Sequence, residues 1–186
     1  MYKELNEQEL ARYCSNHDRM AEEELHRRYA VRVFAICRRY TANMEDAKDL
    51  SMEVLMHALQ KIESYQYSGK GSLYGWIRRI TINLAVNHIK RPRLMMLPLD
   101  PWAKDVIEDP SAEEVETIPK EYLLSWISEL PPMKRAVFNL FHIDGYSHRQ
   151  ISELLDISEK SSSSILAKAK KDLKAKIRQY IKDRDK

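Results

Sequence analysis

The stretch YQYSGKGSLYGWIRRITINLAVNHIKR, residues 65–91, joins a glycine-containing loop to a segment with helical periodicity. The loop is predicted over residues 65–71 and the helix over residues 72–90, where Ile77, Ile80 and Leu84 recur at the spacing of one buried helix face. Pro92 follows and ends the helix. We predict that this helix completes a compact helical domain formed by residues 1–91.

The same stretch also has the composition of a nucleic-acid-binding surface. No acidic residue occurs between Glu63 and Asp100, so no nearby negative charge in the sequence offsets the positive charges of its basic side chains. Cations neutralise phosphates, aromatic rings stack on unpaired bases at ~1–3 kcal/mol per base, and amides can bond base edges. The alternative is a loop followed by an ordinary core helix. The candidate nucleic-acid-binding residues are Tyr65, Tyr67, Lys70, Ser72, Tyr74, Trp76, Arg78, Arg79, Asn83, Asn87 and Lys90.

The composition is typical of a soluble helical protein. It has 186 residues, a formal net charge of +3, 32% charged residues and four glycines. No apolar run approaches the roughly 20 residues that cross a bilayer, and no signal segment is present at the charged N-terminus. We therefore expect a cytoplasmic protein without membrane insertion. Cys14 and Cys37 match no metal-ligand spacing, and we expect buried free thiols in preference to a disulfide, with no metal and no cofactor.

The residues before the loop predict three helices. A short helix is expected over residues 7–15, and a longer one through residue 40 that Asp18 caps. Asn43 is predicted to cap the third helix, over residues 44–64. The expected buried stripes are Leu25, Tyr29, Val33 and Cys37 in the second helix, and Ala47, Leu50, Val54, Ala58 and Ile62 in the third.

Residues 92–119 differ in amino-acid composition from the segments on either side. Five prolines deny a continuous helix, and six acidic residues between 105 and 116 give the segment a negative bias. We predict an extended, flexible linker. Its acidity could serve solubility, or it could imitate nucleic acid and lie in a basic channel.

Residues 120–186 predict a second helical domain that contains a helix-turn-helix. Helices are expected from residue 120 to just before Pro131, over residues 132–143, from a capping box at Ser147 and Gln150 to residue 155, and from a Ser158 cap towards residue 180. The fold class is therefore all-α, with two small helical domains joined by a flexible, acidic, proline-containing linker.

The last helix opens with small and basic side chains, which suit close approach to a DNA groove and its phosphates. The alternative is a solvated helix whose lysines serve solubility. The candidate DNA-contacting residues of this domain are Arg149, Lys160, Ser161, Ser163, Ser164, Ala167, Lys168 and Lys171.

Three motifs in this order resemble the extracytoplasmic-function (ECF) sigma factors of bacterial RNA polymerase. EDAKDLSMEVL at residues 45–55 is similar to the family's EDAxDLTQEVF, and GSLYGWIRRITINLA at residues 71–85 resembles GSFRAWLYRIARNLA. Leu130-Pro131-Pro132, Gly145-Tyr146-Ser147 and Ile157-Ser158-Glu159 lie at the spacing of LPPxxR…GYSxxEIAxxLGIS. The chain departs from these patterns at Met52, Asp156, Ser162 and Ser163.

The resemblance implies a function for each part of the chain. The helix over residues 44–64 would dock on the clamp of the largest subunit of the polymerase core. The stretch at 65–91 would capture the melted single strand of the minus-ten element, and Trp76 could either brace the loop or stack on a base. The helix-turn-helix would bind duplex promoter DNA at the minus-thirty-five element. An anti-sigma factor would be a further partner. The resemblance implies no catalytic activity. The polymerase-binding residues would be Asp46, Asp49, Glu53, His57 and Gln60.

Two other functions are compatible with parts of this sequence. Asp46, Asp49 and Glu53 have a spacing that could bind Mg²⁺ in a nuclease, but no second carboxylate cluster accompanies them. A stand-alone helix-turn-helix transcriptional regulator would explain residues 120–180 and leave the aromatic, cationic loop without a function. The two DNA-binding alternatives differ in whether binding requires polymerase core.

Overall fold

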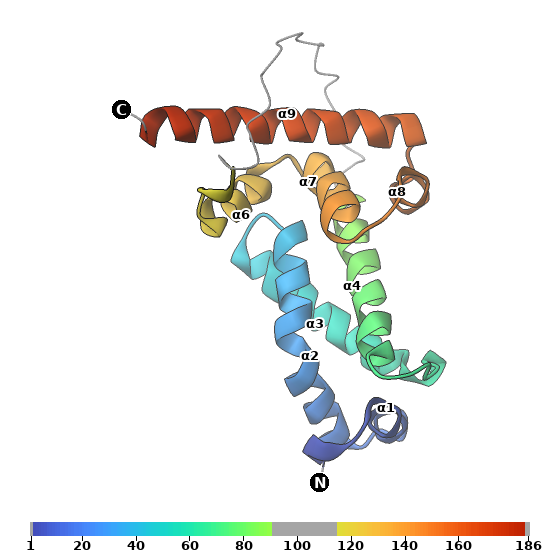
Figure 1. Cartoon of the computed structure of the whole chain (residues 1–186). Coiled ribbons are helices and arrows are strands. Elements are labelled where there is room, and N and C mark those ends of the chain that lie inside the picture. The colour runs from blue at the N-terminus through green and yellow to red at the C-terminus, as the bar shows by residue number, and fades with distance from the viewer. Residues whose placement is uncertain (1, 91–114, 185–186) are drawn as a thin grey trace. The chain divides into compact units, whose positions relative to one another are not determined.

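A computed structural model describes residues 2–90 and 115–184, and every regular element in these two ranges is a helix (Figure 1). This confirms the predicted all-α fold class. The chain divides into two compact units, Met1–Asn87 and His88–Lys186. Apart from residues 115–119, the predicted linker lies outside the described residues.

The first unit contains η1 (Tyr2–Glu4), α1 (Glu7–Ser15), α2 (Arg19–Tyr40), α3 (Met44–Gln60), η2 (Ile62–Ser64) and α4 (Ser72–Lys90) except for the last three residues of α4. The predicted caps are present. An Asp18 carboxylate oxygen accepts hydrogen bonds from the backbone N–H groups of Met20 and Ala21 at 2.9 and 3.2 Å, and Asn43 accepts one from Asp46 at 2.7 Å. In Figure 1, α3 passes behind α2 and α4 runs beside the pair.

Both predicted apolar stripes are buried and form the core of the first unit. Cys14 and Cys37 are buried free thiols, and burial raises the pKa of each to about 12, so both are protonated at neutral pH. The predicted 44–64 helix is wrong in one respect, because α3 ends at Gln60. Lys61 leaves helical geometry with φ −105° and ψ 8°, and the tighter η2 turn then places Ile62 in the core at 4% exposure.

The second unit contains α6 (Lys120–Glu129), α7 (Pro132–Phe138), η4 (Asn139–Ile143), α8 (His148–Leu155) and α9 (Glu159–Arg184). In Figure 1, α9 is the long helix against which α6, α7 and α8 lie. The predicted single helix over residues 132–143 is instead α7 followed by a π-helical turn. The Asp144 N–H reaches back five residues to the Asn139 carbonyl at 2.9 Å, and the Asn139 side chain is fully buried.

Apolar side chains from α7, α8 and α9 form the core of the second unit, and Lys134 of α7 pairs with Asp172 of α9 at 2.8 Å. Asp156 ends α8 in the left-handed conformation, with φ 55° and ψ 53°. None of the helices at residues 2–90 and 115–184 is long and apolar enough to cross a bilayer. Over the same ranges, no group of three or more His, Cys, Asp or Glu side chains could hold a metal ion.

Candidate nucleic-acid interface

The exposed face of α4 carries a polar stripe. Gly75, Arg79, Asn83 and Asn87 are all exposed, and their four-residue spacing places them along one side of the helix. The opposite side is buried in the core and includes Ile77. Arg78 and Lys90, which the sequence also suggested, are half-buried beside the stripe. The helix therefore presents one cation and two amides to solvent.

The loop before α4 is braced by its own side chains. The hydroxyl groups of Tyr65 and Ser72 share a hydrogen bond of 2.5 Å, and Ser72 Oγ also accepts one from the Ser68 N–H at 3.3 Å. The rings of Tyr65 and Trp76 lie 5.7 Å apart at 55°. Burial raises the pKa of Tyr65, although the hydrogen bond to Ser72 opposes this effect. Trp76 therefore packs against the loop.

Tyr74 is engaged within the protein, whereas Tyr67 and Lys70 are exposed. The Tyr74 ring stacks on Tyr29 of α2, with centroids 6.2 Å apart and planes at 11°, and the Arg32 guanidinium lies 4.9 Å from its centroid. Tyr67 is 44% exposed. Of the four aromatic residues that the sequence suggested around this loop, Tyr67 has the ring most open to a base.

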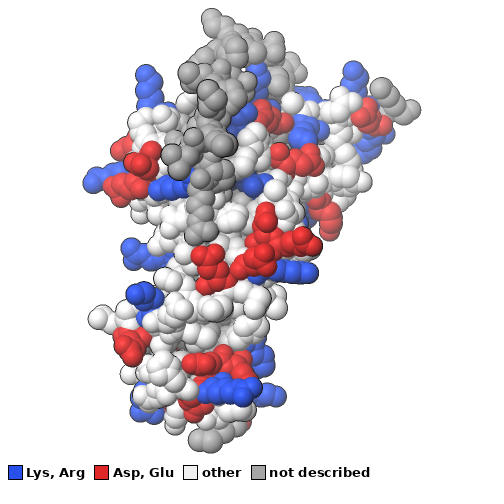
Figure 2. Space-filling model, turned by 180° about the vertical axis from the view of Figure 1, so that it is seen from behind, with Lys and Arg blue, Asp and Glu red and all other residues white. Residues whose placement is uncertain are grey.

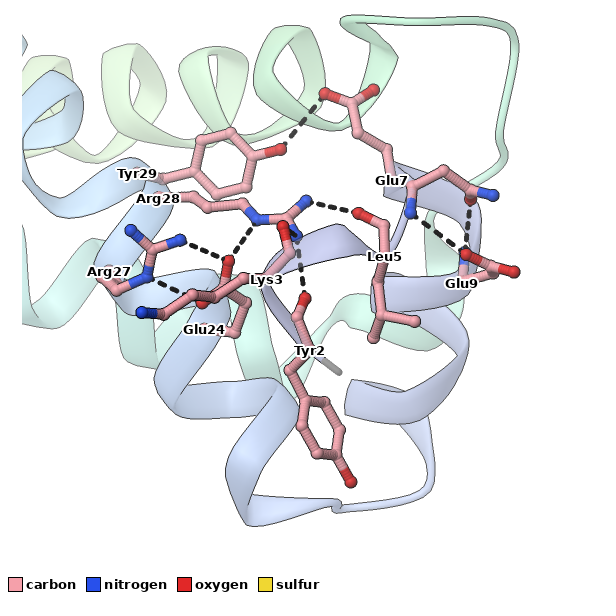
Figure 3. Close-up of polar contacts among 10 residues, drawn as sticks. Tyr2, Lys3, Leu5, Glu7, Glu9, Glu24, Arg27, Arg28 and Tyr29 are labelled. Atoms are coloured by element: carbon pink, nitrogen blue, oxygen red, sulfur yellow. Dashed lines mark hydrogen bonds and ion pairs between the residues drawn. The ribbon is translucent and has the colours of Figure 1, made fainter.

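Glu7 belongs to a hydrogen-bond network that joins the N-terminal segment to α2 (Figure 3), and its carboxylate also reaches the same loop. Glu7 of α1 accepts hydrogen bonds from the Tyr29 hydroxyl at 3.1 Å and from the backbone N–H groups of Gly71 and Leu73 at 2.8 and 3.3 Å. Sequence reasoning missed Glu7, Tyr29 and Arg32 as neighbours of the loop, because no local pattern relates them to residues 65–74.

The outward face of α3 combines acidic and apolar side chains. Asp49, Glu53 and Gln60 are exposed, His57 is half-buried, and these four line a shallow hollow together with Met52 and Met56. The two methionines are 62% and 59% exposed. Asp46 is half-buried and accepts a hydrogen bond from the Asn43 amide at 2.9 Å. Figure 2 views the molecule from the side on which α3 lies in front, and acidic side chains gather there at mid-height.

A polar contact joins the two helices of the helix-turn-helix. Ser162 of α9 is fully buried, and its Oγ lies 2.9 Å from Nδ1 of His148 at the start of α8. The His148 ring also stacks on Phe141, with centroids 4.7 Å apart. The polar Ser162, at a position where the family pattern has an apolar residue, is therefore accommodated because His148 gives its buried hydroxyl group a hydrogen-bond partner.

The outward face of α9 carries basic and small side chains. Lys160, Ser163, Ala167 and Lys170 are exposed, and Lys170 was not among the residues that the sequence suggested. Ser164, Lys168 and Lys171 are half-buried. Ser161 belongs to the helix cap, since its N–H donates to Ser158 Oγ at 3.0 Å. Arg149 is exposed on α8, 3.5 Å from the Glu153 carboxylate.

Both units match known protein families. Residues 25–94 match the family model described as Sigma-70 region 2, and residues 120–173 match Sigma-70, region 4. The chain belongs to the ECF sigma factors. Two of its relatives carry that description. The ECF RNA polymerase sigma factor SigE of Mycolicibacterium smegmatis is 31% identical over 140 residues, and SigM of Bacillus subtilis is 25% identical over 168 residues.

The matches between this sigma factor and its relatives cover different shares of the relatives' length. The match to SigE covers 73% of the chain and 53% of the relative, so the chain spans about half the length of that protein. The match to SigM covers 88% of the chain and 99% of the relative. A solved structure of CnrH in complex with the cytosolic domain of CnrY is 18% identical, covers 91% of this chain and 96% of that chain, and has a TM-score of 0.47. The region 2 match begins at residue 25, so η1 and α1 precede it.

Proposed function

We propose that this sigma factor directs bacterial RNA polymerase core to promoters and opens them through the loop and exposed stripe of its first unit. The α3 face would dock on the clamp of the largest subunit, α4 and its loop would hold the melted minus-ten strand, and α8 and α9 would bind the minus-thirty-five duplex. The site of action would then be the cytoplasm, with the polymerase. Family membership also leads us to expect an anti-sigma factor as a partner.

The observation that carries strand capture is the surface formed by α4 and its loop. Arg79, Asn83 and Asn87 line one exposed side of α4, and Tyr67 and Lys70 are exposed on the loop. This set supplies a ring, two cations and two amides in a stretch without acidic residues. Unpaired bases need stacking, phosphate neutralisation and hydrogen bonds to their edges, and all three are supplied here. Tyr65, Tyr74 and Trp76 support the proposal indirectly, because they hold the loop in shape.

The α3 face supports docking on a protein partner. Asp49 and Glu53 suit a basic surface, whereas Met52 and Met56 are large apolar side chains exposed beside them. Flexible methionines next to charges are typical of surfaces that pack against a partner. Asp46 would contribute mainly as a cap, because it is hydrogen-bonded to Asn43.

The α9 face supports duplex binding. Lys160 and Lys170 lie on either side of Ser163 and Ala167 on the exposed face, so small side chains allow close approach while lysines reach phosphates. Arg149 on α8 adds a cation on the other helix of the motif.

Run-off transcription tests the proposal. Purified bacterial core polymerase would be assayed with and without this protein on fragments of genomic promoter regions. Core-dependent transcripts with defined start sites are expected, and an anti-sigma factor would be detected as an inhibitor of that activity. Binding of the protein to duplex DNA without core, combined with no new transcripts, would instead favour the stand-alone regulator.

A further inference from the structure

The N-terminal segment ahead of the region 2 match is attached to the proposed strand-capture loop through one side chain. Glu7 lies in the first turn of α1, and α1 packs on α2 and η2. One of its carboxylate oxygens, Oε2, accepts hydrogen bonds from the backbone N–H groups of Gly71 and Leu73 at 2.8 and 3.3 Å. These groups lie 64 and 66 residues away in sequence, so the contact joins two distant parts of the chain.

The carboxylate of Glu7 serves as the cap that α4 lacks in its own sequence. The first N–H groups of a helix have no partner within it, and a Ser, Thr, Asp or Asn at the preceding position usually accepts from them. Gly71 occupies that position, with φ +90°, and has no side chain to offer. Glu7 supplies the acceptor from another helix, and its negative charge is favourable at a helix N-terminus.

The second carboxylate oxygen holds the loop by another route. Oε1 accepts a hydrogen bond from the Tyr29 hydroxyl at 3.1 Å (Figure 3). The Tyr29 ring stacks on Tyr74, which lies in the first turn of α4. One carboxylate therefore fixes the backbone at residues 71 and 73 and, through Tyr29, the ring at residue 74.

The position of Glu7 is itself fixed by an anchored segment. The Arg28 guanidinium donates to the backbone carbonyl oxygens of Leu5, Tyr2 and Lys3 at 2.7, 2.9 and 3.1 Å. Glu24 in turn accepts from Arg28 at 2.6 Å (Figure 3). The chain that leads into α1 is thereby fastened to α2.

We propose that Glu7 is a positioning residue for the strand-capture loop, which makes the segment before residue 25 part of the promoter-opening machinery. The inference rests on the proposed function. Glu7 contacts no DNA in this mechanism and acts through the loop backbone and Tyr74.

The test uses holoenzyme formed from core polymerase and the full chain, on a promoter fragment that supports run-off transcription. Three quantities are measured for Glu7→Gln: affinity for core, affinity of the holoenzyme for the single-stranded non-template minus-ten oligonucleotide of that promoter, and open-complex yield from permanganate reactivity. Glutamine keeps the size of the side chain but loses the charge and one of the two acceptor oxygens. We expect single-strand affinity and open-complex yield to fall about tenfold, with core affinity unchanged.

Two matched variants separate positioning from general damage to α1. Glu9→Gln makes the same change of charge two residues further along α1. Glutamine can keep the hydrogen bond from the Asn6 N–H, 3.1 Å in the wild type, as Gln150 does at Ser147, and it does not touch the loop, so we expect wild-type opening. Tyr29→Phe removes the hydroxyl but keeps the ring against Tyr74, and we expect a smaller loss than for Glu7→Gln. Wild-type opening by Glu7→Gln, a parallel loss of core affinity, or an equal loss in Glu9→Gln would each overturn the inference. Failure of the proposed function is distinguishable, because the wild-type protein would then start no transcripts with core.

Discussion

Replacing Glu24 with Gln tests how firmly the N-terminal segment is fastened to α2. The Glu24 side chain is 5% exposed and accepts two hydrogen bonds of 2.7 Å from Arg27 and one of 2.6 Å from Arg28. The hydrogen bonds from Arg27, and to a smaller extent the bond from Arg28, lower the pKa of this carboxyl group from 4.5 to about 2, although burial acts in the opposite direction.

The size of the effect follows from this pKa. Lowering the pKa of a carboxyl group from 4.5 to about 2 corresponds to roughly 3 kcal/mol of stabilisation of the folded state. The Arg27 side chain is 57% exposed, and solvent screening reduces the expected contribution to about 1–2 kcal/mol. Because the folded-state pKa is lowered, this stabilisation is present above about pH 4.5 and is lost as the pH falls towards 2.

Hydrogen exchange followed by mass spectrometry measures the loss of stability in α2 separately from any change in the second unit. We expect Glu24→Gln to lower the free energy of opening of α2 by about 1–2 kcal/mol at pH 7, and by less as the pH approaches 3. Glu23→Gln is the matched control, because Glu23 is 58% exposed and pairs with Arg19 at 3.2 Å, so a change below about 0.5 kcal/mol is expected. Equal effects of the two substitutions, or a Glu24 effect that stays constant down to pH 3, would refute the reasoning.

Three further predictions concern the second unit. Ser162→Ala removes the buried partner of His148 and should lower the free energy of unfolding by about 1–2 kcal/mol in urea, whereas Ser163→Ala, at an exposed site, should change it little. Asp156→Ile places a β-branched residue at φ 55° and should lower the melting temperature, whereas Asp156→Gly should not. Lys160→Ala should reduce the slope of log affinity for upstream duplex DNA against log salt by about 0.9, and Lys182→Ala near the end of α9 should leave the slope unchanged.

Most of the helical elements were predictable from the sequence because their signals are local. Asp18, Asn43 and the Ser147–Gln150 capping box mark helix starts through contacts that span two or three residues. The apolar stripes of α2 and α3 follow from periodicity alone. The errors at residues 61 and 139 concern how a helix ends. Periodicity predicts that Ile62 is buried but not that the chain breaks at Lys61 before it, and it does not predict the burial of the polar Asn139, which depends on tertiary packing.

The candidate site was predictable in composition but not in contacts. The sequence identified the aromatic loop, yet the stacking of Tyr74 on Tyr29 and the capping of α4 by Glu7 join residues that are far apart in the chain. A glutamate in the first turn of a short helix has an ordinary local explanation, so no pattern distinguished Glu7 from Glu9. Only the folded arrangement separates the glutamate that holds the loop from the one that caps its own helix.

The two units orient their proposed DNA-facing helices by the same physical means. In the first unit, Glu7 of an earlier helix accepts a hydrogen bond from the Leu73 N–H in the first turn of α4. In the second unit, His148 of the preceding helix bonds Ser162 near the start of α9. Apolar packing is non-directional and tolerates small rotations of a helix, whereas a hydrogen bond is lost when its two groups move apart. A face that must meet bases or phosphates in one register therefore gains more from one such bond at its first turn than from additional apolar burial.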